Sequence, residues 1–340
     1  MTPPRPVPAS ILLCSPAHTR KLSLGCPSLD RFLGGGIDHG GITEVAGEAG
    51  SGKTQLALQL MLHVQLPHGR GGLGGGAVYL HSDHASYVPA LNRLRTLAEA
   101  FARAHAALGA TVDRLMDQVS VVQIDDVDTL ASVLQHDVPA FLAEKQVRLV
   151  VLDSIGALFR HAGDDAGRSR ASQQAERAQQ LFAVAARLKS LSDRFNVAVV
   201  VTNQVTDKPL SASGLASAPA YERGACRLAD GASVRVPALG VGWAHCVNTR
   251  LILTRHEVSV PGAPSAASPV VVGGLGAKRK HSSLEWSDDV RVGGWEESSQ
   301  AYCSPSTSTT RTAHIAWSPR LPGRSMRFEV RDDGLHGIAS

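Results

Sequence analysis

A chain of 340 residues can form one large domain, or two modest ones, with a substantial buried core. Hydrophobic residues make up 43% of the chain and aromatic residues only 4%, which argues against the aromatic base-stacking platforms of OB-folds and RNA-recognition sheets. The net charge of +4 permits contact with nucleic acid without requiring it.

Residues 1–21 are rich in proline and contain basic but no acidic residues, which predicts a disordered tail. An organelle transit peptide is the alternative for this segment. No apolar run is long enough for a membrane span, so we expect no membrane partner. The five cysteines are scattered without a C-x-x-C pair, which argues against a disulfide framework or a zinc site and favours the reducing interior of a cell.

Residues 22–259 alternate apolar strands with helices. Strands are predicted at 42–45, 77–80, 119–124, 148–154, 197–202 and 248–254, and helices at 53–64, 88–108, 127–145 and 170–195. Because the strands lack polar alternation and are separated by helices, the pattern predicts an α/β fold with a mostly parallel central sheet covered by helices on both faces.

The remaining segments are less regular. Residues 206–236 lose periodicity and predict a long mobile loop. Residues 260–310, rich in Gly, Ser, Pro and Val, are interpreted as a low-complexity insertion, and the basic tract 278–281 inside it is a candidate nuclear import signal. Residues 311–340 predict a small antiparallel addition, with strands at 312–317, 326–330 and 335–338, that completes the core.

One stretch matches G-x-x-x-x-G-K-[ST] between a predicted strand and a predicted helix, the context that a phosphate-binding loop requires. Its glycines let backbone N–H groups turn inward around phosphate oxygens, and the helix start adds partial positive charge. Lys53 would reach the β- and γ-phosphates, and Thr54 would offer its hydroxyl to Mg²⁺. The predicted nucleotide-binding residues are Gly47, Glu48, Ala49, Gly50, Ser51, Gly52, Lys53, Thr54 and Gln55. A merely glycine-rich turn is the alternative that the full match disfavours.

Three polar residues stand at or just after the ends of predicted strands, at the edge where parallel sheets bind ligands. Asp153 stands where a phosphate-loop protein places the carboxylate that holds Mg²⁺, with a helix-capping role as the alternative. Gln204 is placed to sense the γ-phosphate, or else it caps a turn. Asp83 is the candidate to orient the attacking water, and a plain loop carboxylate is the alternative.

Two sets of arginines flank these positions. They are Arg160, Arg168 and Arg170 after Asp153, and Arg223, Arg227 and Arg235 after Gln204. Both segments leave the sheet at its ligand edge, so their charges would meet a phosphate backbone while the nucleotide state moves them. For any single arginine a solvated surface position is the alternative, and the DNA-binding hypothesis applies to the set.

Several segments recur together in one family. They are 22–27 (LSLGCP), 35–37 (GGI), 41–44 (GITE), 52–60 (GKTQLALQL), 149–154 (LVVLDS), 202–205 (TNQV), 237–240 (PALG) and 243–244 (WA). The chain resembles the RecA-like P-loop ATPase core of RecA/RadA-type recombinases, and among these a eukaryotic paralogue. The resemblance covers roughly residues 22–253, with 318–322 similar to the segment that caps the nucleotide of a neighbouring protomer.

The resemblance implies a nuclear subunit in homologous-recombination repair of double-strand breaks and crosslinks, with the cytoplasm or an organelle as alternative locations. It implies binding of ATP with Mg²⁺, held by Lys53, Thr54 and Asp153, and of single-stranded or branched DNA, coupled to the nucleotide by Gln204. The implied protein partners are another recombinase paralogue, in a heterodimer, and the main recombinase filament. The subunit would assist that filament and the processing of junctions.

Three departures from the family pattern affect these expectations. The family's catalytic glutamate corresponds to Asp83, which is one methylene shorter, so we expect weak ATP hydrolysis and leave DNA-dependent ATPase activity open. Only 21 residues precede position 22, where the family has a small helical domain, which counts against filament formation by this chain alone. The insertion 260–310 has no recognised counterpart.

Other interpretations remain beside this one. The tetrad 101–104 (FARA) matches a short linking element of the family, but its place in a predicted helix favours core packing. An autonomous strand-exchange recombinase is the first alternative function. A P-loop kinase or transport ATPase that does not act on DNA is the second.

Overall fold

The computed structural model describes residues 8, 20–160, 169–209, 226–227, 233–258 and 308–338. The chain divides into two compact units, Met1–His256 with Thr309–Ser340, and Glu257–Ser308, and nearly all described residues belong to the first. Most of the predicted tail 1–21 lies outside the described residues, as do residues 259–307 with the basic tract 278–281.

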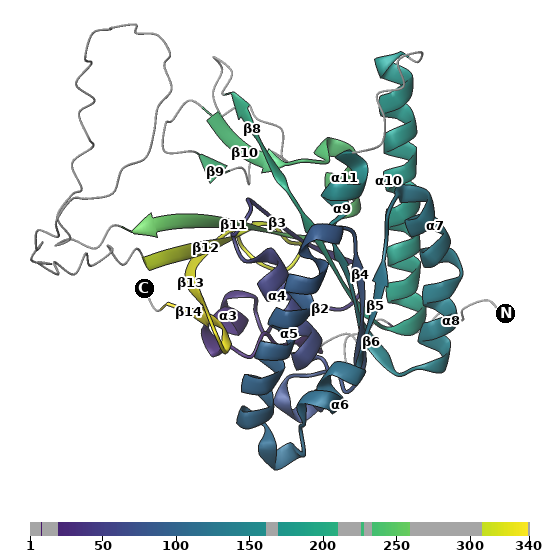
Figure 1. Cartoon of the computed structure of the whole chain (residues 1–340). Coiled ribbons are helices and arrows are strands. Elements are labelled where there is room, and N and C mark those ends of the chain that lie inside the picture. The colour runs from purple at the N-terminus through teal and green to yellow at the C-terminus, as the bar shows by residue number, and fades with distance from the viewer. Residues whose placement is uncertain are drawn as a thin grey trace, which may run out of the picture. The chain divides into compact units, whose positions relative to one another are not determined.

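A nine-stranded sheet forms the centre of the first unit among the described residues (Figure 1). Its order is β14-β13-β12-β11-β3-β7-β6-β4-β5. The strands are β3 (Ile42–Gly47), β4 (Gly76–His81), β5 (Val119–Gln123), β6 (Val147–Asp153), β7 (Ala198–Asn203), β11 (Thr249–Val258), β12 (Ser308–Trp317), β13 (Ser325–Arg331) and β14 (Gly334–Gly337). The strands from β11 to β5 pair in parallel, whereas β12, β13 and β14 pair antiparallel. The predicted fold class is confirmed, and the C-terminal strands extend the same sheet.

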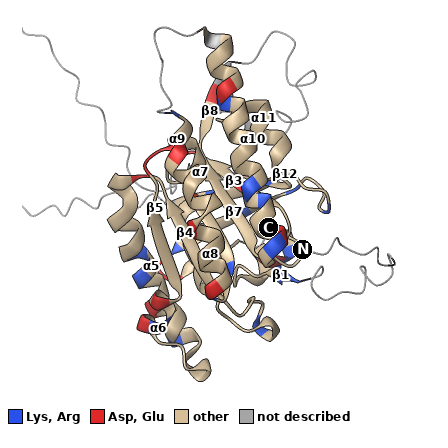
Figure 2. Cartoon of the chain, turned by 90° about the vertical axis from the view of Figure 1, so that its right-hand side faces the viewer, with Lys and Arg blue, Asp and Glu red and all other residues tan. Residues whose placement is uncertain are grey.

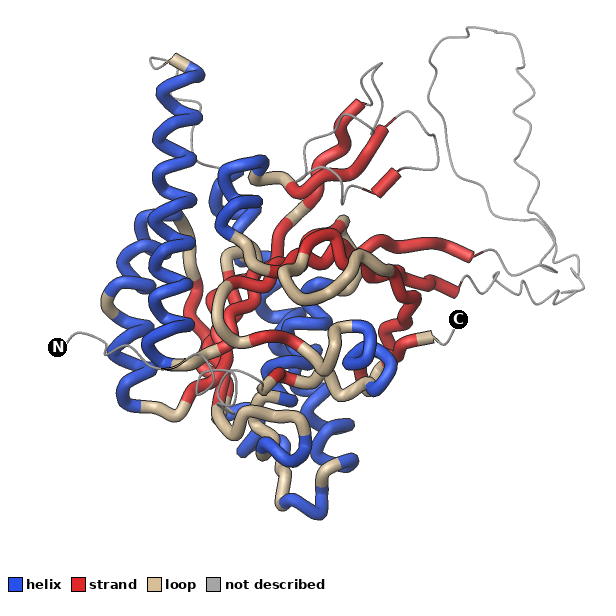
Figure 3. Tube along the Cα trace, turned by 180° about the vertical axis from the view of Figure 1, so that it is seen from behind, coloured by secondary structure: helices blue, strands red, loops and turns tan. Residues whose placement is uncertain are grey.

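Helices cover both faces of this sheet, as Figure 3 shows from behind. They are α3 (Pro27–Phe32), α4 (Lys53–His63), α5 (His84–Ala104), α6 (Val112–Asp117), α7 (Val127–Gln135), α8 (Asp137–Glu144), α9 (Ile155–Arg160), α10 (Arg170–Phe195) and α11 (Gly240–Cys246). The helices α3 to α6 pack on one face and α7 to α11 on the other. Two short strands, β1 (Lys21–Leu22) and β2 (Ile37–Asp38), form a separate antiparallel pair.

The two faces carry separate hydrophobic cores because successive side chains of a strand point to opposite sides. On β4, Tyr79 belongs to the core under α4 and α5, and its neighbours Val78 and Leu80 belong to the core under α7 and α10. A strand buried on both faces is apolar at most positions, which explains the nearly continuous apolar runs in the sequence. Each fully buried aliphatic side chain contributes about 1.5–3 kcal/mol.

The predicted helix 127–145 is wrong as a single element, because the structure divides it into α7 and α8 at His136. Pro139 lies in the first turn of α8. A proline has no N–H to donate and clashes with the carbonyl four residues earlier, so the first turn is the part of a helix that tolerates it best. The helices α6, α9 and α11 were not predicted.

The prediction of one long loop over 206–236 is wrong at both ends. Residues Val205–Pro209 form β8 and Ser233–Pro237 form β10, paired antiparallel with Arg235 opposite Asp207. The strand β9 (Cys226–Arg227) pairs with β10 on its other side. These strands are short and pair across more than 20 residues, so no local pattern announces them. Residues 210–225 and 228–232 lie outside the described part.

Candidate functional site

The glycine loop connects β3 to α4 at the carboxyl edge of the parallel strands. Gly50 and Gly52 have φ values of 72° and 103°, in the region that favours glycine. Leu56 N donates to Gly52 O at 2.9 Å, the first bond of the helix, so the N–H groups of Lys53 and Thr54 have no carbonyl four residues earlier in the helix. This geometry suits a bound anion.

The side chain of Lys53 turns back into this loop. Its Nζ donates to Gly47 O at 2.8 Å and to Glu48 O at 2.7 Å. Burial lowers the pKa of Lys53, while the charges of Asp153 and Glu48 act in the opposite direction. A half-buried ammonium held only by carbonyl oxygens in these two bonds is placed to exchange them for phosphate oxygens, which bind it more strongly.

Asp153 ends β6 and is 7% exposed. Its Oδ2 accepts hydrogen bonds from Thr54 Oγ1 at 2.9 Å and from Tyr79 Oη at 3.0 Å, and its Oδ1 accepts one from Thr202 Oγ1. Burial, with the neighbouring Asp153, raises the pKa of Tyr79, so the phenol stays protonated as the donor. The hydroxyl of Thr54 and a carboxylate thus lie together, the donor set that Mg²⁺ takes with nucleotide phosphates.

A pocket of about 430 Å³ opens beside the loop. It is lined by Gly50, Gly52, Lys53, Thr54, Gln55, Arg93, Arg311, Val330, Arg331 and Asp332. Arg93 Nε donates to Gln55 Oε1 at 2.7 Å and its Nη1 to Asp332 O at 3.1 Å, so the edge of the guanidinium is fixed. Arg311 Nε donates to Gly50 O at 3.0 Å. The pocket is strongly cationic and suits a polyphosphate.

Sequence reasoning missed this wall of the pocket. Arg93 lies within the long helix α5, and Arg311 and Arg331 lie on C-terminal strands that were predicted only as a completion of the core. No local motif marks these arginines, since the pairing of distant strands brings them to the glycine loop.

The structure places Asp83 at the N-cap of α5. Its Oδ1 accepts from Ala85 N at 3.1 Å and its Oδ2 accepts from Ser86 Oγ at 2.9 Å. Both carboxylate oxygens therefore serve the helix start, as capping residues do. Gln204 follows β7 directly, with its N donating to Asn203 Oδ1 at 2.8 Å and its carbonyl accepting from Ala238 N at 2.9 Å.

The predicted DNA-contacting arginines fall into three groups. Arg168 and Arg223 lie outside the described residues. Arg160 is exposed at the end of α9, Arg170 begins α10, and Arg227 lies on β9. Arg235 faces two carboxylates, with Nη1 at 2.7 Å from Glu48 Oε2 and Nε at 3.4 Å from Asp207 Oδ1.

Charges of both signs alternate on the helices away from this edge. In Figure 2 basic and acidic residues are interspersed along α5 and α6, which carry residues such as Arg95, Glu99, Asp113 and Arg114. These two helices therefore offer no single basic surface, and a DNA-binding hypothesis depends on the segments that leave β6 and β7.

A buried polar cluster is centred on β3, the strand that leads into the glycine loop. The carboxylate of Glu44 on β3 is fully buried and accepts from Asn203 Nδ2 at 2.7 Å and Trp243 Nε1 at 3.1 Å. Its other oxygen pairs with Arg250 Nε on β11. The cluster connects β3, β7, α11 and β11, and it fixes Asn203, which precedes Gln204.

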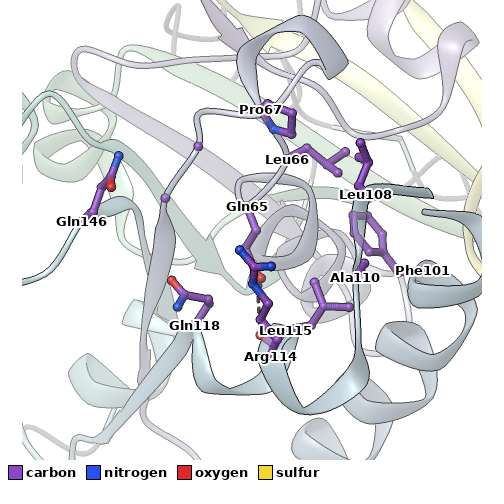
Figure 4. A pocket seen from close by; sticks show the side chains of 12 residues that line it. Gln65, Leu66, Pro67, Phe101, Leu108, Ala110, Arg114, Leu115, Gln118 and Gln146 are labelled. Atoms are coloured by element: carbon purple, nitrogen blue, oxygen red, sulfur yellow. Dashed lines mark hydrogen bonds between the residues drawn. The ribbon is translucent and has the colours of Figure 1, made fainter. Parts of the chain in front are cut away.

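A second pocket, also of about 430 Å³, lies at the opposite edge of the parallel strands, where β4 and β6 begin (Figure 4). Its lining includes Leu66, Phe101, Leu108 and Leu115 together with several glutamines. Phe101 of the tetrad 101–104 is 8% exposed and packs edge-on against His63 at 5.0 Å between ring centroids. Its burial agrees with core packing of Phe101, whereas Ala104 at the end of the tetrad is exposed.

The described residues include no helix that is long and apolar enough to cross a membrane. They contain no group of three or more His, Cys, Asp or Glu side chains arranged to hold a metal ion. A Mg²⁺ ion bound with a nucleotide needs no such group, because phosphates and water supply most of its ligands.

The parallel sheet, the glycine loop at its carboxyl edge and Asp153 opposite Thr54 define the class of P-loop nucleotide-binding proteins with a RecA-like core. Residues 17–255 match the family described as Rad51, and the chain belongs to this family. Membership in it implies nucleotide binding.

The chain is also similar to individual members. It is 33% identical to a protein named "DNA repair protein XRCC3 homolog" from Arabidopsis thaliana. The matched region is 337 residues long and covers 97% of each chain. It is 33% identical over 326 residues to "DNA repair protein XRCC3" from Bos taurus, covering 95% of this chain and 76% of that protein. The protein named "DNA repair protein rhp57" from Schizosaccharomyces pombe is 31% identical over 255 residues, or 72% of each chain.

Proposed function

We propose that this chain is an ATP- and DNA-binding recombinase paralogue that acts in homologous-recombination repair of double-strand breaks and crosslinks. The observation that carries the proposal is the juxtaposition of Lys53, Thr54 and Asp153 at the carboxyl edge of the sheet, in a chain of the Rad51 family. The names of its relatives from Arabidopsis thaliana and Bos taurus support a role in DNA repair.

The residues of the cationic pocket would divide the work of holding ATP. Lys53 and the N–H groups at the start of α4 would bind the β- and γ-phosphates. Thr54 and Asp153 would hold Mg²⁺, which when bound neutralises phosphate charge. The edge of Arg93 is occupied by Gln55 and Asp332, so its flat face is left to stack on the base.

Hydrolysis is expected to be weak. In-line attack on the γ-phosphate needs a group that orients water, and the predicted group, Asp83, already caps α5 with both oxygens. The chain would then use ATP chiefly as a signal of state, with Gln204 and the segments after β6 and β7 relating that state to single-stranded or branched DNA. A nuclear subunit that pairs with another paralogue and assists the main recombinase filament and junction processing fits this behaviour.

The test of the site is the affinity for ATP of the Lys53→Ala variant, measured by isothermal titration. We expect binding to be lost, because the phosphates lose the Lys53 ammonium, which is aimed into the glycine loop. Lys145→Ala is the matched control, since Lys145 is exposed at the end of α8. Unchanged ATP affinity in Lys53→Ala would refute the assignment of the site.

Steady-state ATP turnover with and without single-stranded DNA separates the proposal from its alternatives. ATP that is bound and barely hydrolysed supports the assembly subunit. Strong stimulation by DNA, together with filaments formed by the chain alone, would favour an autonomous recombinase. Absence of DNA binding with a partner paralogue present would favour an ATPase that does not act on DNA.

A further inference from the structure

Arg235 bridges the small sheet of β8, β10 and β9 and the glycine loop. Its Nη1 lies 2.7 Å from Glu48 Oε2, and its Nε lies 3.4 Å from Asp207 Oδ1 on the neighbouring strand. The side chains of Arg235 and Glu48 are only 25% and 24% exposed. A charge-assisted bond in such a half-buried place is screened less than a surface pair.

Glu48 needs a cationic partner because it stands inside the phosphate-binding sequence. Its backbone oxygen accepts from Lys53 Nζ at 2.7 Å, and its Oε1 accepts from Arg255 N at 2.9 Å. The negative charge of Glu48 acts on Lys53. Like the charge of Asp153, it opposes the lowering of the Lys53 pKa by burial. A carboxylate so close to the phosphates of a nucleotide would repel them unless another charge compensates it.

We propose that Arg235 is a positioning residue of the nucleotide site, which neutralises Glu48 and holds it away from the place of the phosphates. This inference rests on the proposed function and reassigns Arg235 from the DNA-contacting set to the ATP site. It also gives the glycine loop a direct connection to β8, which begins one residue after Gln204.

The test compares ATP and ADP affinities of wild type, Arg235→Ala and the double variant Arg235→Ala/Glu48→Gln. We expect Arg235→Ala to bind ATP about tenfold more weakly, with a smaller loss for ADP, because ATP brings more negative charge near the uncompensated carboxylate. Adding Glu48→Gln removes that carboxylate and should restore most of the affinity. Arg187→Ala is the matched control, as Arg187 bonds to Gln135 between α10 and α7.

Arg235→Gln keeps a polar, hydrogen-bonding side chain but removes the charge and shortens the reach, so it gives the same comparison if alanine unfolds the small sheet. A wild-type ATP affinity in both Arg235 variants, combined with weakened binding to single-stranded DNA, would overturn the proposal and restore the DNA contact. An equal loss for ATP and ADP without rescue by Glu48→Gln would also overturn it, by showing a purely structural role.

The two proposals fail separately. Failure of the proposed function appears in wild type and Lys53→Ala, as absent or indifferent ATP binding. If wild type binds ATP and Lys53→Ala does not, while Arg235→Ala behaves as wild type, only the assignment of Arg235 is lost.

Discussion

Replacing Arg250 by methionine tests the buried cluster around Glu44, on the strand that leads into the glycine loop. Glu44 is 0% exposed and Arg250 is 4% exposed, so the pair is shielded from water. The Arg250→Met variant would leave the carboxylate with only two neutral donors, Asn203 and Trp243. Breaking a buried ion pair from one side costs about 3–5 kcal/mol.

One detail places the expected loss at the lower end of that range. Arg250 Nη2 is buried without a hydrogen-bond partner, so removing the guanidinium also removes an unsatisfied donor. We therefore expect Arg250→Met to lower the free energy of unfolding by about 3 kcal/mol, out of the roughly 5–15 kcal/mol of an ordinary domain. The double variant Glu44→Gln/Arg250→Met should recover at least half of the loss, because no buried charge remains.

Urea unfolding at pH 7.5, followed by circular dichroism, measures these differences as shifts of the midpoint at constant slope. Arg187→Met, on the exposed side of α10, is the control and should change stability by less than about 0.5 kcal/mol. A loss below about 1 kcal/mol in Arg250→Met would refute the reasoning. So would a double variant no more stable than the single one.

Three further predictions concern single positions. Burial, with the charge of His105, lowers the pKa of His63 from 6.5 to about 4, so the unfolded chain binds more protons below pH 6.5 and stability falls as the pH drops towards 4. Between pH 7.5 and 5 the free energy of unfolding, measured with urea, should fall by about 2 kcal/mol in wild type and by clearly less in His63→Asn. Equal falls in the two proteins would contradict this cause. Asp83→Ala should lose about 1 kcal/mol through the missing cap of α5; a loss of ATP turnover without any loss of stability would indicate the catalytic role instead. In Gly47→Ala the new Cβ would lie 2.5 Å from Leu253 O, so we expect a loss of about 1–3 kcal/mol and a lower melting temperature, and an unchanged melting temperature would show that the loop yields freely.

The sequence alone was sufficient to predict those structural features that residues close together in the chain determine. The glycine loop is set by residues within one strand, one turn and one helix, and the buried strands are visible as continuous apolar runs. The position of Asp153 at the end of β6 followed from the same run. The fold class could therefore be predicted from the order of elements.

Features that depend on distant partners could not be predicted. Arg235 looked like any arginine in a polar loop until β10 paired with β8 and brought it to Glu48. Arg311 reaches Gly50 across 261 residues of sequence. In the sequence, Glu44 is a polar residue within a predicted strand, and only the tertiary structure shows that its carboxylate is fully buried.

The pocket beside the glycine loop has one wall from the first sixth of the chain and another from its last tenth. At about 5–20 residues per second, Arg311 leaves the ribosome roughly 10–50 seconds after Lys53. During that interval the nascent chain holds a phosphate-binding loop without Arg311, Arg331 and Asp332. The complete cationic pocket is thus a property of the finished polypeptide, and a message cut short before β12 would encode a loop that lacks this wall.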